Sequence, residues 1–141
     1  MKGLPFEDLD FAKVDHHREL RQGFPEVIYG EGKTPQQICS IASAILSRSG
    51  KVLVTRASEE AYREVQSVHH NANYDNSSKI ITILSETDNR PGVPGLLVAC
   101  AGTSDLPVAI EASITAEMMG CDVNRIFDVG VAGIHRLFDK M

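Results

Sequence analysis

The feature that most constrains this chain is an alternation of strand and helix patterns between residues 26 and 84. Glu26–Gly30 (E-V-I-Y-G), Lys51–Thr55 (K-V-L-V-T) and Ile80–Leu84 (I-I-T-I-L) are short runs rich in β-branched residues, which are typical of strands. The continuous run of Lys51–Thr55 is typical of a strand that is covered on both faces. Because predicted helices separate these strands, the sequence predicts a parallel α/β layer.

The first of these helices has strong start and stop signals. Thr34 is a good N-cap, Pro35 suits the first helical position, and Gln37 completes a capping box. Ser49-Gly50 ends the helix. Its predicted buried face has the spacing of one helical stripe and consists of Ile38, Ile41, Ala42, Ile45 and Leu46.

Three further segments complete the predicted N-terminal module. A second helix begins at Ser58 and runs to about His69, with Ala61, Val65 and Val68 facing inward. The charged stretch from about Leu9 to Arg21 predicts a surface helix. The polar stretch Asn71–Ser78 predicts a loop.

A change of composition marks the end of that module. Glu86–Pro94 contains two prolines and a glycine and breaks the alternation. We therefore predict an N-terminal α/β module over residues 1–88, a linker over 89–94 and a second module over 95–141. The second module is predicted to hold a buried strand over Gly95–Ala101, a helix over Ser104–Met119, a strand over Arg125–Val131 and a final helix from Ile134. On the first of these helices we predict that Val108, Ala112, Ala116 and Met119 share one face.

This second module is too small to complete a covered parallel sheet. Two parallel strands with one complete crossover helix cannot bury both faces of a sheet. We therefore expect either partner elements from another chain or a longer protein of which this sequence is the front part, and we favour the longer protein.

Composition and charge exclude several classes of function. The chain has 141 residues and a net charge of −5, so no global positive field draws it to nucleic acid or to an anionic membrane. No apolar run approaches the about 20 residues that a membrane helix needs, and the acidic N-terminus lacks the core of a signal peptide. The three cysteines include no C-x-x-C pair, which fits neither a disulfide framework nor a zinc site. We expect a cytoplasmic protein.

The most informative motif is A-G-T-S-D-L-P-V-A, which follows the predicted strand and opens the predicted helix. Ligands of doubly wound sheets bind at this edge. Gly102 permits close approach of a ligand to the backbone, while Thr103, Ser104 and Asp105 offer hydroxyls, helix-start N–H groups and a carboxylate. The alternative is that Ser104 or Asp105 merely caps the helix.

A second cluster, G-V-A-G-I-H-R, follows the next predicted strand, so Gly133, His135 and Arg136 should lie at the same sheet edge. Arg136 supplies a planar donor fork for phosphate, and His135 can exchange a proton near neutral pH. Two adjacent strand ends with these side chains predict a nucleotide site.

The same motifs resemble known families. G-T-S-D-L-P and G-I-H-R are similar to the G-S-x-S-D and S-A-H-R motifs of the purine-pathway carboxylases called PurE. The segments D-H-H-R-E-L-R-Q-G-F-P-E-V-I-Y-G-E-G-K-T-P-Q-Q-I, V-T-R-A-S, A-G-T-S-D-L-P-V-A and I-F-D-V-G-V-A-G-I-H-R-L resemble LarB. That family pairs an N-terminal α/β module with a PurE-like, doubly wound (Rossmann-like) domain, and the resemblance extends from Asp15 to the end of the chain.

The resemblance to LarB implies an activity in nickel-pincer nucleotide biosynthesis. The family carboxylates the pyridinium ring of nicotinic acid adenine dinucleotide with CO2 as co-substrate, then hydrolyses the phosphoanhydride and releases AMP. By this resemblance Ser104 and Asp105 hold the ribose-phosphate and pyridinium end, Arg136 grips phosphate, and His135 binds phosphate or moves a proton. Gly102, Thr103 and Gly133 complete the implied binding site, with Asp105 and His135 as its catalytic residues. No firmly bound cofactor is implied, and the need for a divalent metal is undetermined.

The sequence departs from these families in two respects. Gly133-Ile134 stands where PurE proteins have serine-alanine, and the cysteine thought to act as the family's nucleophile matches none of the three cysteines here. We therefore expect the 141-residue chain alone to be inactive and the complete enzyme to be a homo-oligomer. Alternatives are an aminoimidazole ribonucleotide carboxylase or mutase, and a non-catalytic nucleotide-binding regulatory module. Glu31, Arg56 and His16 remain candidate ligand contacts of the N-terminal module.

Overall fold

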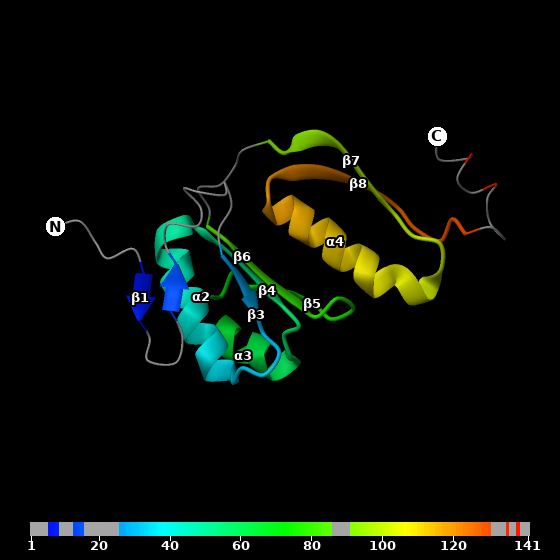
Figure 1. Ribbon diagram of the computed structural model, residues 1–141. Helices are drawn as coiled ribbons and strands as arrows, with labels where there is room; N and C mark the ends of the chain where they lie inside the picture. The colour runs from blue at the N-terminus through cyan, green and yellow to red at the C-terminus, as the bar shows by residue number, and fades with distance from the viewer. Residues whose placement is uncertain are drawn as a thin grey trace. The chain divides into compact units, whose positions relative to one another are not determined.

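The computed structural model describes residues 6–8, 13–15, 26–85 and 91–130, together with His135 and Phe138. The chain divides into two compact units, Met1–Asn89 and Arg90–Met141 (Figure 1). The division falls within the segment in which the sequence predicts a linker. None of the described helices is long and apolar enough to cross a membrane.

The first unit is built on a four-stranded sheet with the order β3-β4-β6-β5. Strands β3 and β4 are parallel, whereas β6 is antiparallel to both β4 and β5. Their bounds are β3 Val27–Tyr29, β4 Lys51–Thr55, β5 Asn73–Asp75 and β6 Ile80–Leu84. The predicted α/β class is confirmed, but the layer is mixed and not wholly parallel. The cause is that β5 forms within the predicted loop Asn71–Ser78 and returns as a hairpin, so β6 enters the sheet in the opposite direction.

The predicted start and stop signals of α2 (Pro35–Ser49) are confirmed. The Gln37 N–H donates to Thr34 Oγ1 at 3.2 Å, and the Thr34 N–H donates to Gln37 Oε1 at 3.0 Å. Gly50 ends the helix with φ 71°, a left-handed conformation that glycine adopts without steric cost.

Helix α3 (Glu59–Val68) begins as predicted, with Ser58 as N-cap. Ala61 and Val65 are buried as predicted, but the prediction for Val68 is wrong, because its side chain is 57% exposed. Val68 is the last helical residue, beyond the part of α3 that packs on the sheet.

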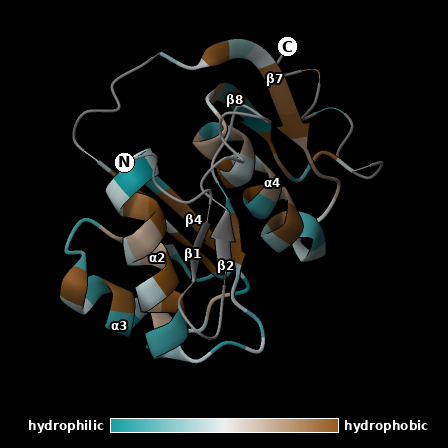
Figure 2. Ribbon diagram, turned by 60° about the vertical axis from the view of Figure 1, so that its left-hand side comes forward, coloured by the Kyte–Doolittle hydropathy of each residue, from teal (hydrophilic) through white to brown (hydrophobic). Residues whose placement is uncertain are grey.

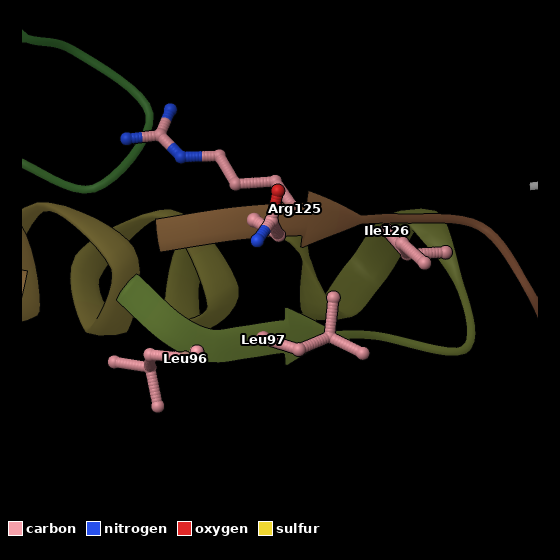
Figure 3. Close-up of a pocket in the computed structure, with 6 residues that line it drawn as sticks. Leu96, Leu97, Arg125 and Ile126 are labelled. Atoms are coloured by element: carbon pink, nitrogen blue, oxygen red, sulfur yellow. The ribbon is translucent and has the colours of Figure 1, made fainter. Parts of the chain in front are cut away.

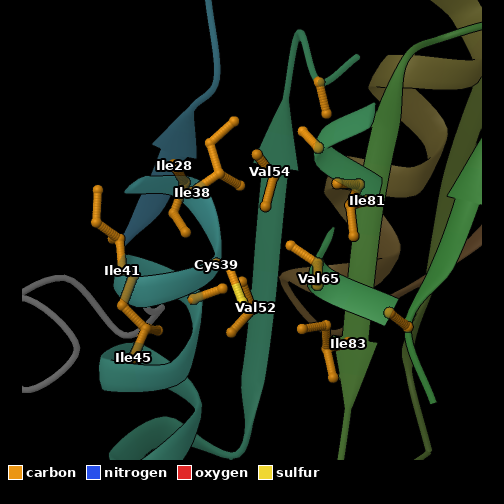
Figure 4. Close-up of a cluster of buried hydrophobic side chains, with 14 residues drawn as sticks. Ile28, Ile38, Cys39, Ile41, Ile45, Val52, Val54, Val65, Ile81 and Ile83 are labelled. Atoms are coloured by element: carbon orange, nitrogen blue, oxygen red, sulfur yellow. The ribbon is translucent and has the colours of Figure 1, made fainter. Parts of the chain in front are cut away.

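The core of the first unit lies between one face of its sheet and the helices α2 and α3 (Figure 4). Alternate residues of β4 and β6 point into it, which leaves the other side chains of these strands on the opposite face. The buried cluster consists of Ile28, Ile38, Cys39, Ile41, Ala42, Ile45, Val52, Val54, Ala57, Ala61, Val65, Ala72, Ile81 and Ile83.

The predicted helix over Leu9–Arg21 is contradicted in its described part. Strands β1 (Phe6–Asp8) and β2 (Lys13–Asp15) form an antiparallel pair with Phe6 opposite Asp15. The helix prediction rested on charge and on weak local propensity, which strand pairing can override. Residues 9–12 and 16–25 lie outside the described part of the chain.

The second unit contains a two-stranded parallel sheet, β7 (Val93–Ala99) and β8 (Cys121–Ile126), joined by helix α4 (Leu106–Met118). Register pairs Leu97 with Asn124 and Ala99 with Ile126. The second predicted strand is therefore shifted: β8 begins directly after the turn at Gly120, where φ is 92°, and ends before the left-handed residue Asp128.

The prediction of a buried strand over Gly95–Ala101 is wrong, because β7 is exposed along most of its length. Much of β7 is coloured as hydrophobic in Figure 2, and its apolar side chains are nevertheless exposed, with Leu97 52% exposed. Val108 and Met119, predicted on one face of the helix, are also exposed, whereas Ala109, Ser113 and Met118 are buried. The apolar residues of α4 are distributed around most of the helix. Their pattern therefore did not identify the face that packs on the sheet.

Candidate functional site

The predicted ligand loop lies at the carboxyl ends of the parallel strands β7 and β8. The Cys100 N–H donates to Ile126 O at 3.1 Å, and the Val129 N–H donates to Cys100 O at 3.2 Å. One residue further on, the Gly130 N–H donates to Ala101 O at 2.8 Å. These bonds continue the pairing beyond both strands, so the two outgoing segments lie side by side at one edge of the sheet. Such an edge is where ligands of parallel α/β sheets bind.

Gly102 and Gly130 both lie at this edge, but packing of the chain requires a glycine only at position 130. A Cβ atom on Gly130 would lie 2.8 Å from Ala101 O, so the close approach of the two segments requires glycine there. Gly102 has an extended backbone with φ −134°, and the nearest atoms to an added Cβ are 3.9 and 4.0 Å away. The chain itself therefore does not require glycine at position 102, and the space in front of it is open for a ligand.

A single turn of 3-10 helix, Thr103–Asp105, follows Gly102. The Asp105 N–H donates to Gly102 O at 3.1 Å, and Asp105 Oδ2 accepts the Gly102 N–H at 3.3 Å. The side chains of Thr103, Ser104 and Asp105 are all exposed. Within the described part of the chain, neither hydroxyl makes a hydrogen bond, so both are open to a ligand.

The alternative that Asp105 only caps the helix fits the structure in part. Asp105 is the residue before α4, but its carboxylate makes no capping bond to that helix and instead closes the turn onto Gly102. Ser104 lies within the 3-10 turn and makes no cap either. The sequence correctly predicted a helix start here and placed it two residues too early.

A shallow apolar groove borders this turn. Among the described residues that line it, Asp105 is the only charged one, and the Cys100 thiol at its edge donates a weak hydrogen bond to Gly102 O at 3.8 Å. The groove can therefore accept a flat apolar group whose end meets one carboxylate. Its lining consists of Val98, Ala99, Cys100, Ala101, Asp105, Val108, Ala109 and Ala112.

A second groove crosses the open face of β7 and β8, with α4 behind the strands in Figure 3. Arg125 lines it and donates from Nη2 to both carboxylate oxygens of Glu117, at 2.7 and 2.8 Å. Among the described residues of the second unit, Arg125 is the one arginine, and this pairing engages its charge. A phosphate at the site would therefore need a cation from elsewhere, for which the sequence names Arg136.

The second predicted cluster is described only in part. His135 has helical backbone and an exposed side chain, whereas Gly133 and Arg136 lie outside the described residues. The placement of these three residues beside the Gly102–Asp105 loop remains a prediction.

Asp128 lies outside the strand in which the sequence predicts it. Asp128 follows β8 and has φ 60°, a left-handed conformation that few residue types other than glycine tolerate. The flanking segments bond to the β7 end, so Asp128 is held at the same edge as the loop. The signal in the sequence was the D-V-G segment after an apolar run, since aspartate and glycine favour such backbone turns.

The corresponding edge of the first unit carries a different polar cluster. The Tyr29 hydroxyl donates to the Glu31 carboxylate, which raises the pKa of Tyr29, and Lys33 Nζ donates to Tyr29 O at 2.7 Å. Arg56 follows β4 with φ 54° and an exposed side chain. Of the candidate contacts named from the sequence, Glu31 is thus engaged by Tyr29, and His16 lies outside the described residues.

Comparison with known proteins identifies the family of the chain. Residues 6–85 match the model of the LarB/PurE-like N-terminal domain, which covers the first unit and leaves the candidate site outside the match. The chain is also 33% identical over 134 residues to an uncharacterized protein, MJ0165, of Methanocaldococcus jannaschii. This alignment covers 92% of the chain and 52% of the relative, so the chain spans about half the length of that protein. The match over more than half of its residues shows that the chain belongs to the LarB/PurE-like N-terminal domain family.

Proposed function

We propose that this protein acts in the LarB-type reaction, the CO2-dependent carboxylation of nicotinic acid adenine dinucleotide followed by release of AMP. The observation that carries the proposal is the open Gly102–Asp105 turn at the joined ends of β7 and β8. The family membership of the first unit supports the same reading.

The chemistry requires activation of an electron-poor ring. A nucleophile that adds to the pyridinium ring creates an enamine, whose carbon can attack CO2. After loss of the ring proton and departure of the nucleophile, the ring is aromatic again and carries a new carboxylate. The anionic dinucleotide must be held in place through these steps.

The residues of the turn suit the binding part of this task. The hydroxyls of Thr103 and Ser104 can donate to phosphate or ribose oxygens, and Asp105 can accept from ribose hydroxyls or face the cationic ring. We assign the phosphate to Arg136, and phosphate binding or proton transfer to His135. Both assignments rest on the motif resemblance.

The nucleophile is the part of the chemistry that these residues do not supply. All three cysteines are free thiols. Burial raises the pKa of Cys39, which lies in the core of the first unit, and a buried thiol of this kind is inert. None of the three matches the family's nucleophile, so we expect no turnover from the 141-residue chain by itself.

Titration of the protein with nicotinic acid adenine dinucleotide, aminoimidazole ribonucleotide and AMP tests the proposal. We expect the dinucleotide to bind most tightly and Asp105→Ala or Arg136→Ala to weaken it by about tenfold or more. Asp122→Asn, which removes an exposed carboxylate at the opposite end of β8, is the matched control. Unchanged affinity in both variants would refute the site.

The same titration separates the other two functions. The PurE-like character of the family favours an aminoimidazole ribonucleotide carboxylase or mutase as second candidate, and it predicts preferential binding of the ribonucleotide. A regulatory module would bind AMP or the dinucleotide without turnover even in the presence of CO2.

We also propose a cytoplasmic homo-oligomer. Several exposed apolar side chains on β7 support association, since large exposed apolar surfaces commonly mark interaction sites. Light scattering of the purified protein would test it, and a monomer at micromolar concentration would argue against it.

A further inference from the structure

We draw no further inference here: the strongest candidate, the groove across the open face of β7 and β8 that Leu96, Leu97 and Ile126 line, carries none, because nothing in the described part of the chain shows what covers this apolar face.

Discussion

The two units of this chain share one local arrangement but differ in how much of it they bury. Each contains a pair of parallel strands joined through a helix, and a glycine bonds across the strand ends in both, Gly30 to Thr55 O at 2.7 Å and Gly130 to Ala101 O at 2.8 Å. In the first unit Ile81 is 0% exposed, whereas Leu97 of the second unit is 52% exposed. The sequences of the strands are about equally apolar, so hydrophobicity alone does not determine burial.

The number of covering elements explains the difference. In the first unit β5 and β6 widen the sheet, and two helices pack side by side on one face, which closes a core. The second unit has two strands and one long helix, so one face of its sheet and one side of α4 have no cover within the described part of the unit. A parallel pair becomes a core only when further strands and helices extend it.

The largest expected effect is the contrast between a buried and an exposed aliphatic residue. Ile81→Ala should lower the free energy of unfolding of the first unit by about 2–5 kcal/mol, because it leaves a cavity in a closed core. Leu97→Ala in the second unit should change its stability by about 0.5 kcal/mol or less. Urea unfolding followed by circular dichroism would measure both. Similar losses in the two variants would show that Leu97 is covered in solution.

The glycine contacts across the strand ends should come next. Gly30→Ala and Gly130→Ala each place a methyl group 2.8 Å from a backbone oxygen and should cost about 1–3 kcal/mol, since the backbone must shift. Gly102→Ala is the matched control, because its Cβ meets nothing closer than 3.9 Å and the fold should tolerate it. Thermal unfolding would rank the three variants. If Gly102→Ala were the most damaging to stability, the structural reason given for each glycine would be wrong.

Helix capping provides a smaller test of the comparison. Thr34→Ala removes the capping box of α2 and should destabilise the first unit by about 1 kcal/mol. Asp105→Ala removes no cap from α4, because the Asp105 carboxylate bonds to Gly102, and it should cost the second unit less. Urea midpoints of the two variants would decide this, and a larger loss for Asp105→Ala would contradict it.

The smallest expected effect is a pH dependence from the first turn of α3. Hydrogen bonds from its own backbone N–H and then from Ser58 lower the pKa of Glu60 below the ordinary value of 4.5. A carboxyl whose pKa is lower in the folded state stabilises the protein above its ordinary pKa, and this contribution is lost as the pH falls through the lowered value. The stability difference between wild type and Glu60→Gln should therefore shrink between pH 6 and about pH 3. A difference that grows on acidification would have the wrong sign.

The sequence correctly predicted those helices, strands and turns that depend on interactions within a few residues. The ends of α2 follow from Thr34, Pro35 and Gly50, which act on their own backbone within one helical turn. The strands β4 and β6 were predicted to the residue, because runs rich in β-branched residues favour the extended conformation. The predicted ligand loop does follow a strand, since its glycine and polar residues end the apolar run.

Predictions failed where a distant segment decides the outcome. The residues of β6 predict a strand but not its direction in the sheet. That direction depends on whether β5 forms a hairpin with β6. The left-handed backbone of Asp128 was not predicted, because it arises where two strand ends are bonded together. Val108 and Met119 were predicted on one face of α4, but the identity of the packed face depends on the sheet beside it.

The sequence by itself thus determined the α/β class, both ends of α2, the N-cap of α3 and the position of the polar turn Gly102–Asp105. Each depends on interactions within a few residues, or on the backbone preferences of single residues. Only the tertiary structure decided strand direction, which apolar residues are buried, and which backbone segments are paired at the β7–β8 edge. These depend on contacts between segments far apart in the chain, and burial in particular depends on how many layers pack together.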